Sequence, residues 1–212
     1  MKIGFYSESV ADQAALAVFT EGILGEPPEP IDMALEGHGV TSVLSLLANV
    51  FRGVYYNSDA QGLVVVVDCD DTELHSPDHD KPDCEGKRCR LCQARAIVAG
   101  AEKNLKRRQG RTELKVAIGL AVPAIEAWYL VGKNHQVGEA AWIVGLNAKN
   151  LPFRRRELKQ LVYGTDRPSI ELETDRAKEE ARRILDNITA IEMAFPAGFG
   201  SMAREIRSWK FK

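Results

Sequence analysis

Hydrophobic and polar positions alternate with two periods along the first 132 residues, one typical of strands and one typical of helices. Short apolar runs bounded by polar or turn residues predict β-strands at 2–7, 31–35, 63–67 and 115–122. Longer segments with apolar side chains every three to four residues predict helices at 10–24, 41–51, from after 88 to about 109, and 123–132. The chain therefore alternates strand and helix.

The run Leu63–Val67 is apolar at every position, which indicates a strand covered on both faces. Such strands lie in the centre of parallel sheets whose connections are helices. The sequence therefore predicts an α/β fold of the Rossmann-like, doubly wound type, with a mostly parallel four-stranded sheet flanked by helices.

Beyond residue 132 the strand pattern disappears. A basic segment, Pro152–Tyr163, and a later apolar repeat at 177–191 predict helices, and a last short helix is expected near 202–209. We therefore expect a 1–132 α/β domain, with a polar insertion at 71–92, followed by a helical C-terminal appendage at 133–212.

Composition adds two constraints. With 212 residues and a formal net charge of −2, the chain can bury one sizeable core but is not coated in positive charge for bulk nucleic-acid binding. No apolar run approaches the roughly 20 residues needed to cross a bilayer, and Glu8 and Asp12 lie where a signal peptide would be apolar. These features favour a cytoplasmic location.

Acidic side chains follow three of the predicted strands. Glu8 follows the first, Asp68 and Asp70 follow the valine run, and Glu126 lies just after the fourth. Because parallel strands end at the same edge of a sheet, we expect these carboxylates to converge. Converging carboxylates favour either a raised pKa or a bound hard cation, and we predict Mg²⁺ or Mn²⁺ on Glu8, Asp68 and Asp70. The alternative is that each acid is a loop residue or helix cap.

The same ordered residues resemble the TOPRIM superfamily, especially small stand-alone TOPRIM-like proteins related to the OLD-family nucleases. The resemblance rests on Glu8, on Asp68-x-Asp70 after a hydrophobic strand, and on the later segment around Glu126, and it covers about residues 1–132. It implies Mg²⁺-dependent phosphodiester chemistry on DNA or RNA, most often nuclease activity, and a role in phage defence beside an ATPase partner protein. The family commonly has Gly after the first Glu, whereas this chain has Ser9.

Basic residues of the appendage are candidates for the same site. Lys159, or the neighbouring Arg154–Arg156, would stabilise negative charge on a reacting phosphate if the helix folded over the acids. Glu8 is the candidate general base. The alternative is that this basic run is a solvated helix face.

The polar insertion carries a second possible metal site. Cys89 and Cys92 form a Cys-x-x-Cys pair, and together with Cys84 and His79 they would supply the four ligands that a structural Zn²⁺ prefers. His75 is an alternative ligand. Without zinc, the segment would be a loop with reduced thiols.

Two other functions fit part of the sequence. Asp68-Cys-Asp70-Asp-Thr72 matches the Asp-x-Asp-x-Thr pattern of haloacid-dehalogenase phosphatases, in which Asp68 would be the nucleophile and Asp70 the acid–base. A non-catalytic binding or scaffold protein with a zinc loop is the third possibility.

Overall fold

The computed structural model describes residues 1–33, 40–70, 72–81, 89–134 and 136–210. Its strands form a parallel sheet in the order β2-β1-β3-β4. They are β1 (Lys2–Tyr6), β2 (Glu29–Pro30), β3 (Gly62–Asp68) and β4 (Lys115–Ala121). The predicted α/β fold with a four-stranded parallel sheet is confirmed.

The valine-rich strand β3 lies inside the sheet, paired with β1 on one side and β4 on the other. All of its residues are buried. Burial of both faces explains why the run from Leu63 to Val67 contains no polar side chain.

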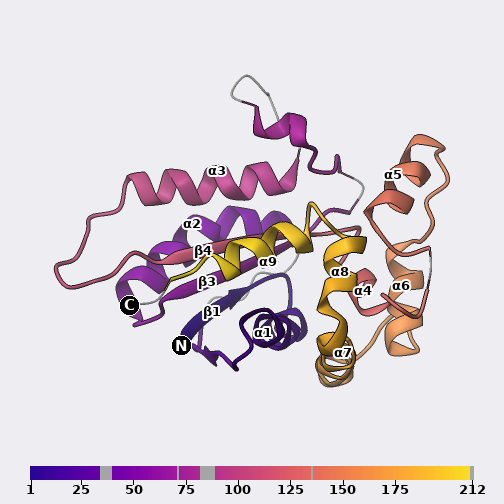
Figure 1. Ribbon diagram of the computed structural model, residues 1–212, viewed down its shortest axis with the longest axis horizontal. Coiled ribbons are helices and arrows are strands. Elements are labelled where there is room, and N and C mark those ends of the chain that lie inside the picture. The colour runs from indigo at the N-terminus through magenta and orange to yellow at the C-terminus, as the bar shows by residue number, and fades with distance from the viewer. Residues whose placement is uncertain (34–39, 71, 82–88, 135, 211–212) are drawn as a thin grey trace.

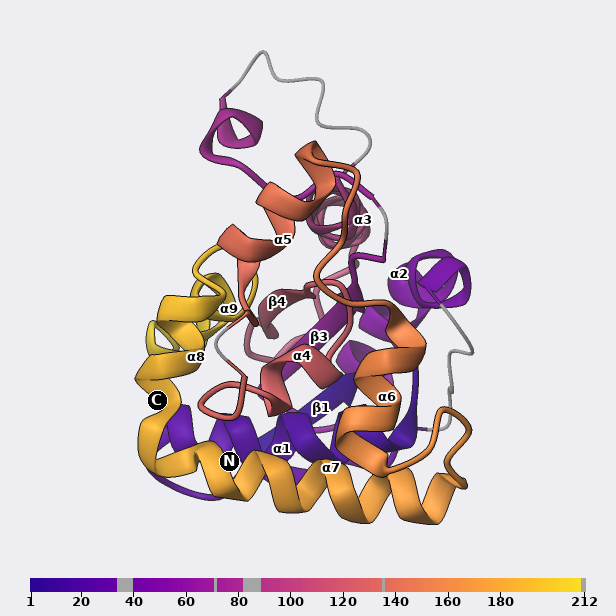
Figure 2. The same cartoon turned by 90° about the vertical axis from the view of Figure 1, so that its right-hand side faces the viewer.

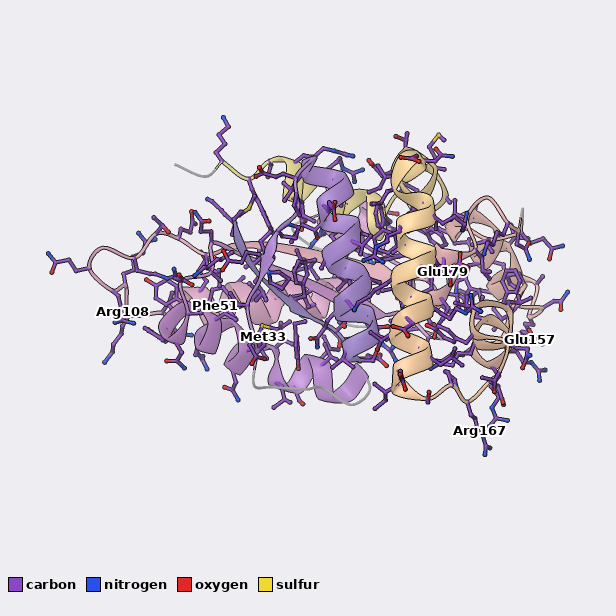
Figure 3. All side chains as sticks on the ribbon, turned by 90° about the horizontal axis from the view of Figure 1, so that it is seen from below. Met33, Phe51, Arg108, Glu157, Arg167 and Glu179 are labelled. Atoms are coloured by element: carbon purple, nitrogen blue, oxygen red, sulfur yellow. The ribbon has the colours of Figure 1, made fainter. Side chains whose placement is uncertain are left out.

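Helices cover both faces of the sheet (Figure 1). The helices α2 (Val40–Asn57) and α3 (Arg90–Lys103) lie on one face, and α1 (Val10–Leu24) and α9 (Phe199–Arg207) lie on the other. Beyond α1, helix α7 (Ile170–Ile184) forms an outer layer and runs beside α1 over most of its length (Figure 3).

The chain order places a topological switch point between β1 and β3. The connection through α1 leads outward to β2, whereas those through α2 and α3 lead in the opposite direction on the opposite face. Reversing both direction and face keeps the hand of the crossovers the same. In such sheets, ligands bind beyond the carboxyl ends of the strands at this point.

Several predicted boundaries were wrong. The expected strand at 31–35 is a two-residue strand, β2, placed just before it, and residues 34–39 lie outside the described residues. Helix α3 ends at Lys103 rather than near Gln109, because the backbone of Lys106 is held by Tyr56 instead of by the helix. The Tyr56 hydroxyl donates to the Lys106 carbonyl oxygen and accepts from the Lys106 N–H. Pro123 does not start a helix, and α4 comprises only Glu126–Tyr129.

The C-terminal third is helical among its described residues. After α4 come α5 (Glu139–Asn147), α6 (Arg155–Tyr163) and α7, then the 3₁₀ turn Leu185–Asn187, α8 (Ile188–Ala194) and α9. Figure 2 looks onto the carboxyl ends of the strands, where α4 and α6 lie in front of the sheet. The division at residue 132 stays a prediction, although α9 packs directly on β4. Among the described helices, none combines the length and apolar content needed to cross a bilayer.

Candidate functional site

Three predicted acids converge on one arginine at the carboxyl edge of the sheet. The Arg155 guanidinium lies 3.0 Å from Glu8 Oε2, 2.8 Å from Asp68 Oδ2 and 3.1 Å from Asp70 Oδ1. The expected convergence of Glu8, Asp68 and Asp70 is therefore present, but basic side chains, Arg155 and also Arg90 on Asp70, stand where we predicted a divalent cation. Arg155 is the first residue of α6, so the predicted basic helix does fold over the acids.

Strand geometry brings the acids together. Glu8 lies two residues beyond β1, and Asp68 ends the adjacent strand β3. Ser9 is the N-cap of α1, and its side chain accepts a hydrogen bond from the Asp12 backbone N–H at 3.1 Å. This cap gives a local reason for a serine directly after Glu8.

Asp70 is held in an unusual conformation. Its φ of 47° lies in the left-handed region. Residues other than Gly seldom adopt this backbone conformation, although Asp does so more often than most. Its backbone N–H donates to the Pro123 carbonyl oxygen at 2.8 Å, which ties the end of β3 to the segment after β4. A residue held in this region is typical of functional sites.

A second arginine supports the same acids from the opposite face of the sheet. Arg90, the first residue of α3, donates to the Asp68 carbonyl oxygen at 2.6 Å and to Asp70 Oδ2 at 2.7 Å. The Ile125 backbone N–H donates to Asp68 Oδ1 at 3.2 Å. Each side-chain oxygen of Asp68 and of Asp70 therefore accepts a hydrogen bond.

Glu126 and Lys159 form the other part of the site. Lys159 Nζ lies 3.7 Å from Glu126 Oε1 and 2.8 Å from Glu173 Oε1. Arg154 and Arg156, the other two candidates from the basic run, are exposed. Of these three arginines, Arg155 alone forms ion pairs with the acids among the described contacts.

These residues surround a cavity of about 180 Å³. It is lined by Glu8, Ser9, Asp12, Asp68, Ile125, Glu126, Arg155, Lys159 and Glu173. Sequence reasoning did not assign Asp12 or Glu173 to the site. Asp12 could have been found because it lies one helical turn after Glu8, whereas Glu173 comes from α7 and carried no signal.

Burial and mutual repulsion alter the protonation of the carboxyl groups. Burial, together with the Glu126 charge, raises the pKa of Asp12 to about 8. Burial also raises the pKa of Asp68, with Glu8 adding to the shift and Arg155 opposing it. The pKa of Glu126 is raised by burial against the pull of Lys159. Two carboxylate oxygens, Glu8 Oε1 and Glu126 Oε2, are buried without a hydrogen-bond partner among the described residues.

The insertion brings together a second cluster, of His75, His79, Cys89 and Cys92. One ligand atom from each lies within 4.8 Å of the others, so the cluster could hold a metal ion. His75 Nδ1 is 3.8 Å from Cys89 Sγ and 3.4 Å from Cys92 Sγ.

Carboxylates orient both histidines of this His/Cys cluster. His75 Nε2 lies 3.3 Å from Asp80 Oδ1, and His79 Nε2 lies 3.4 Å from Glu73 Oε1. His75 Nδ1 therefore faces the sulfur atoms, and His79 Nδ1 is buried without a hydrogen-bond partner among the described residues. Sequence reasoning did not assign Glu73 and Asp80 to this cluster, although they lie close to the histidines along the chain.

The structure groups His75, expected as an alternative ligand, with the predicted ligands His79, Cys89 and Cys92. Cys84, the other predicted ligand, lies outside the described residues, so its part in the cluster stays a prediction.

No family model, curated protein or solved structure matches the chain. The function is therefore inferred from the two centres themselves.

Proposed function

We propose that this protein is a divalent-metal-dependent enzyme that cleaves phosphodiester bonds in nucleic acid, with Mg²⁺ or Mn²⁺ held by Glu8, Asp68 and Asp70. One observation carries the proposal, a surplus of carboxyl groups over cationic side chains at the topological switch point of the sheet. Among the described residues, six carboxyl groups gather in or beside the cavity, against three cationic side chains. The acids are Glu8, Asp12, Asp68, Asp70, Glu126 and Glu173, and the cations are Arg90, Arg155 and Lys159.

The donor atoms fit a hard cation. Mg²⁺ and Mn²⁺ prefer carboxylate oxygens, and the acids here offer oxygens from two adjacent strands. Glu8 Oε1 and Glu126 Oε2 are buried without a hydrogen-bond partner among the described residues, and an unpaired buried carboxylate oxygen is costly.

Arg155 is the group with which a cation would compete. Its side chain is 42 % exposed, so it can leave the acids without unpacking the core. A guanidinium binds phosphate oxygens as well as carboxylates, often through two parallel hydrogen bonds. In the proposed enzyme, Arg155 turns from the acids toward the phosphate of the bound nucleic acid.

The other residues have distinct tasks. A bound divalent ion would polarise the phosphate and offset charge on the leaving oxygen. Glu8 has two carboxylate oxygens, so that one could bind the ion while the other accepts a proton from an attacking water. Lys159 lies on the same helix as Arg155 and would add positive charge beside the phosphate.

A cleavage assay tests this function. The protein would be incubated with Mg²⁺ or Mn²⁺ and with single- and double-stranded DNA and RNA, beside the isosteric variant Asp70→Asn. We expect metal-dependent strand cleavage that falls at least about 100-fold in the variant, because the substitution removes the charge of a ligand. Cleavage that persists at the wild-type rate in Asp70→Asn would remove the acids from the mechanism.

Para-nitrophenyl phosphate separates the alternatives in the same experiment. Hydrolysis of this ester without strand cleavage would favour the haloacid-dehalogenase type of phosphatase, and inactivity on every substrate would favour a non-catalytic scaffold. Both oxygens of Asp68 are engaged by Ile125 and Arg155, which disfavours Asp68 as a nucleophile.

Arg155→Gln tests the competition between arginine and metal. Without a divalent ion, the variant should be destabilised by about 2 kcal/mol, because it leaves three acids unpaired. Mn²⁺ should restore stability and bind at least about tenfold more tightly than to wild type, as measured by thermal unfolding and titration followed by electron paramagnetic resonance. Arg156→Gln, with the same charge loss on the exposed side of α6, is the control and should behave as wild type. Equal Mn²⁺ affinity in both variants would show that Arg155 does not compete.

For the His/Cys cluster, we propose zinc. Tetrahedral zinc bonds of about 2.0 Å to nitrogen and 2.3 Å to sulfur place neighbouring ligand atoms about 3.3–3.8 Å apart. The His75–Cys separations of 3.4 and 3.8 Å match this spacing. The Asp80 and Glu73 contacts match the carboxylate–histidine arrangement common around zinc.

Zinc content distinguishes a site with His75 as the fourth ligand from the predicted site with Cys84 in that place. We expect about one zinc per chain, retained in Cys84→Ser and strongly reduced in Cys92→Ser and in His75→Gln. Loss of zinc from Cys84→Ser with retention in His75→Gln would favour the set of three cysteines and one histidine.

A further inference from the structure

The His/Cys cluster and the carboxylate site are connected through the start of one helix. Helix α3 begins at Arg90, its N-cap is Cys89, and Cys92 lies in its first turn. Arg90 is the residue that donates to Asp68 and Asp70. The backbone that carries two cluster thiols is therefore the same backbone that aims Arg90 at the acids.

The segment after Asp70 is fixed by the other half of the cluster. His75 and His79 come from the stretch 72–81, which follows Asp70 directly along the chain. An ion bound by all four side chains would join this stretch to the first turn of α3. Such an ion would therefore connect the segment that begins just after Asp70 to the helix turn that carries Arg90.

We propose that the metal of the His/Cys cluster acts as a positioning element for the carboxylate site, with Arg90 as the positioning residue through which it acts on Asp70. This inference rests on the proposed metal in the cluster and extends it by assigning the ion a task at the other centre. Arg90 is 16 % exposed and Asp70 is 34 % exposed, so their 2.7 Å ion pair is partly shielded from solvent. The pair helps to hold the left-handed backbone at Asp70, which costs free energy to maintain.

Without the ion, few apolar contacts fix this region. Among the described side chains of the stretch 72–81, Leu74 alone belongs to the buried core. The others are polar or charged. The first turn of α3 has no side-chain N-cap hydrogen bond. Leu91 anchors the first turn of α3 in the core, so loss of the metal should mainly loosen the stretch 72–81 and its tie to that turn.

Hydrogen exchange provides a readout that does not depend on activity. The backbone N–H groups of Cys69, Asp70 and Thr72 donate to Ala121, Pro123 and Cys69 respectively. Exchange of the peptide covering 69–72 would be followed by mass spectrometry in zinc-loaded and chelator-stripped wild type, with zinc measured in each sample. We expect stripping to accelerate exchange at least about tenfold and zinc addition to reverse it.

Arg90→Gln separates the proposed coupling from general loosening. This variant should keep its zinc, show fast exchange at 69–72, and gain little further acceleration on stripping, because metal and arginine act through the same contact. Arg90→Lys should recover part of the protection. Lys103→Gln removes the same charge from the exposed last turn of α3 and should behave as wild type.

The outcomes are decisive in either direction. Unchanged exchange at 69–72 after verified removal of zinc would overturn the inference, as would equal acceleration in wild type and Arg90→Gln. A protein that takes up no zinc would overturn it at the first step. Because no arm uses a nucleic-acid substrate, failure of the proposed nuclease activity would leave these results standing.

Discussion

At the scale of single residues, the carboxylate site is defined by which charges have partners. One guanidinium, Arg155, contacts three acids, while among the described residues Glu8 and Glu126 each keep a buried oxygen without a hydrogen-bond partner. Asp12 is also buried, and its burial, together with the charge of Glu126, raises its pKa. Protonation is thus one of the means by which this site tolerates its acids.

Asp12 should make stability depend on pH. Its folded-state pKa of about 8 lies above the ordinary value of 3.8, so between these values the folded protein holds a proton that the unfolded chain releases. The stabilising contribution is complete below about pH 4 and is lost as the pH rises through 8. The free energy of unfolding should therefore fall by up to about 1.4 kcal/mol per pH unit in this window.

Asp12→Asn isolates this effect. The variant cannot ionise, so urea unfolding at pH 5, 6.5 and 8 should give a flatter dependence on pH than in wild type, with the largest gain in stability at pH 8. Asp175→Asn, on the exposed surface of α7, should keep the wild-type slope. Parallel slopes for wild type and Asp12→Asn would assign the proton to another group.

At the scale of elements, strands were predicted more reliably than helix ends. The middle of β3, Leu63–Val67, is buried on both faces and apolar at every position, so the pattern was unambiguous. The end of α3 depends on Tyr56, about 50 residues away along the chain, and no local pattern reports such a contact.

The same distinction holds for the site. Glu8, Asp68 and Asp70 were predictable because strand ends share an edge of the sheet. The choice of Arg155 from three adjacent arginines depends on how α6 docks, which involves tertiary contacts that the sequence does not display. His75 was undervalued because the cysteines supplied the stronger sequence motif.

The turn before α9 sets how closely this helix approaches the sheet. The Glu139 carboxylate accepts hydrogen bonds from the backbone N–H groups of Ala197 and Gly198 at 3.0 and 2.7 Å. A Cβ at Gly198 would overlap the carbonyl oxygen of Leu120, at the end of β4.

Gly198→Ala should therefore cost about 3 kcal/mol of stability, because neither backbone can yield without breaking these contacts. The change would be measured as a lower midpoint of urea unfolding. Gly100→Ala, on an exposed helical position with open space around it, should be neutral or stabilise by about 0.5–1 kcal/mol. Equal midpoints for the two variants would contradict the close approach.

At the scale of the whole molecule, the C-terminal helices complete the layers around the sheet. Met202 of α9 packs against Gly119 of β4, where an added Cβ would lie 2.9 Å from the Met202 sulfur. Helix α7 buries Ala177, Ala181 and Ile184 and runs beside α1 (Figure 3).

A chain truncated after Gly132 should fail to fold cooperatively, because it exposes the apolar faces of α1 and β4 that α7 and α9 cover. Circular dichroism during thermal unfolding would show a broad transition or none. A chain ending at Trp209 keeps all of these helices and should unfold as the full chain does. A sharp transition in the shorter chain would instead support the predicted independent 1–132 domain.

The pairing of early acids with a late arginine also has a consequence for synthesis. A nascent chain that has emerged from the ribosome only through α4 already carries Glu8, Asp68, Asp70 and Glu126, but Arg155 is still inside the exit tunnel or not yet translated. These acids therefore lack their shared partner until α6 has been released. Docking of α6 then neutralises them, so this edge of the sheet is completed only at the end of synthesis.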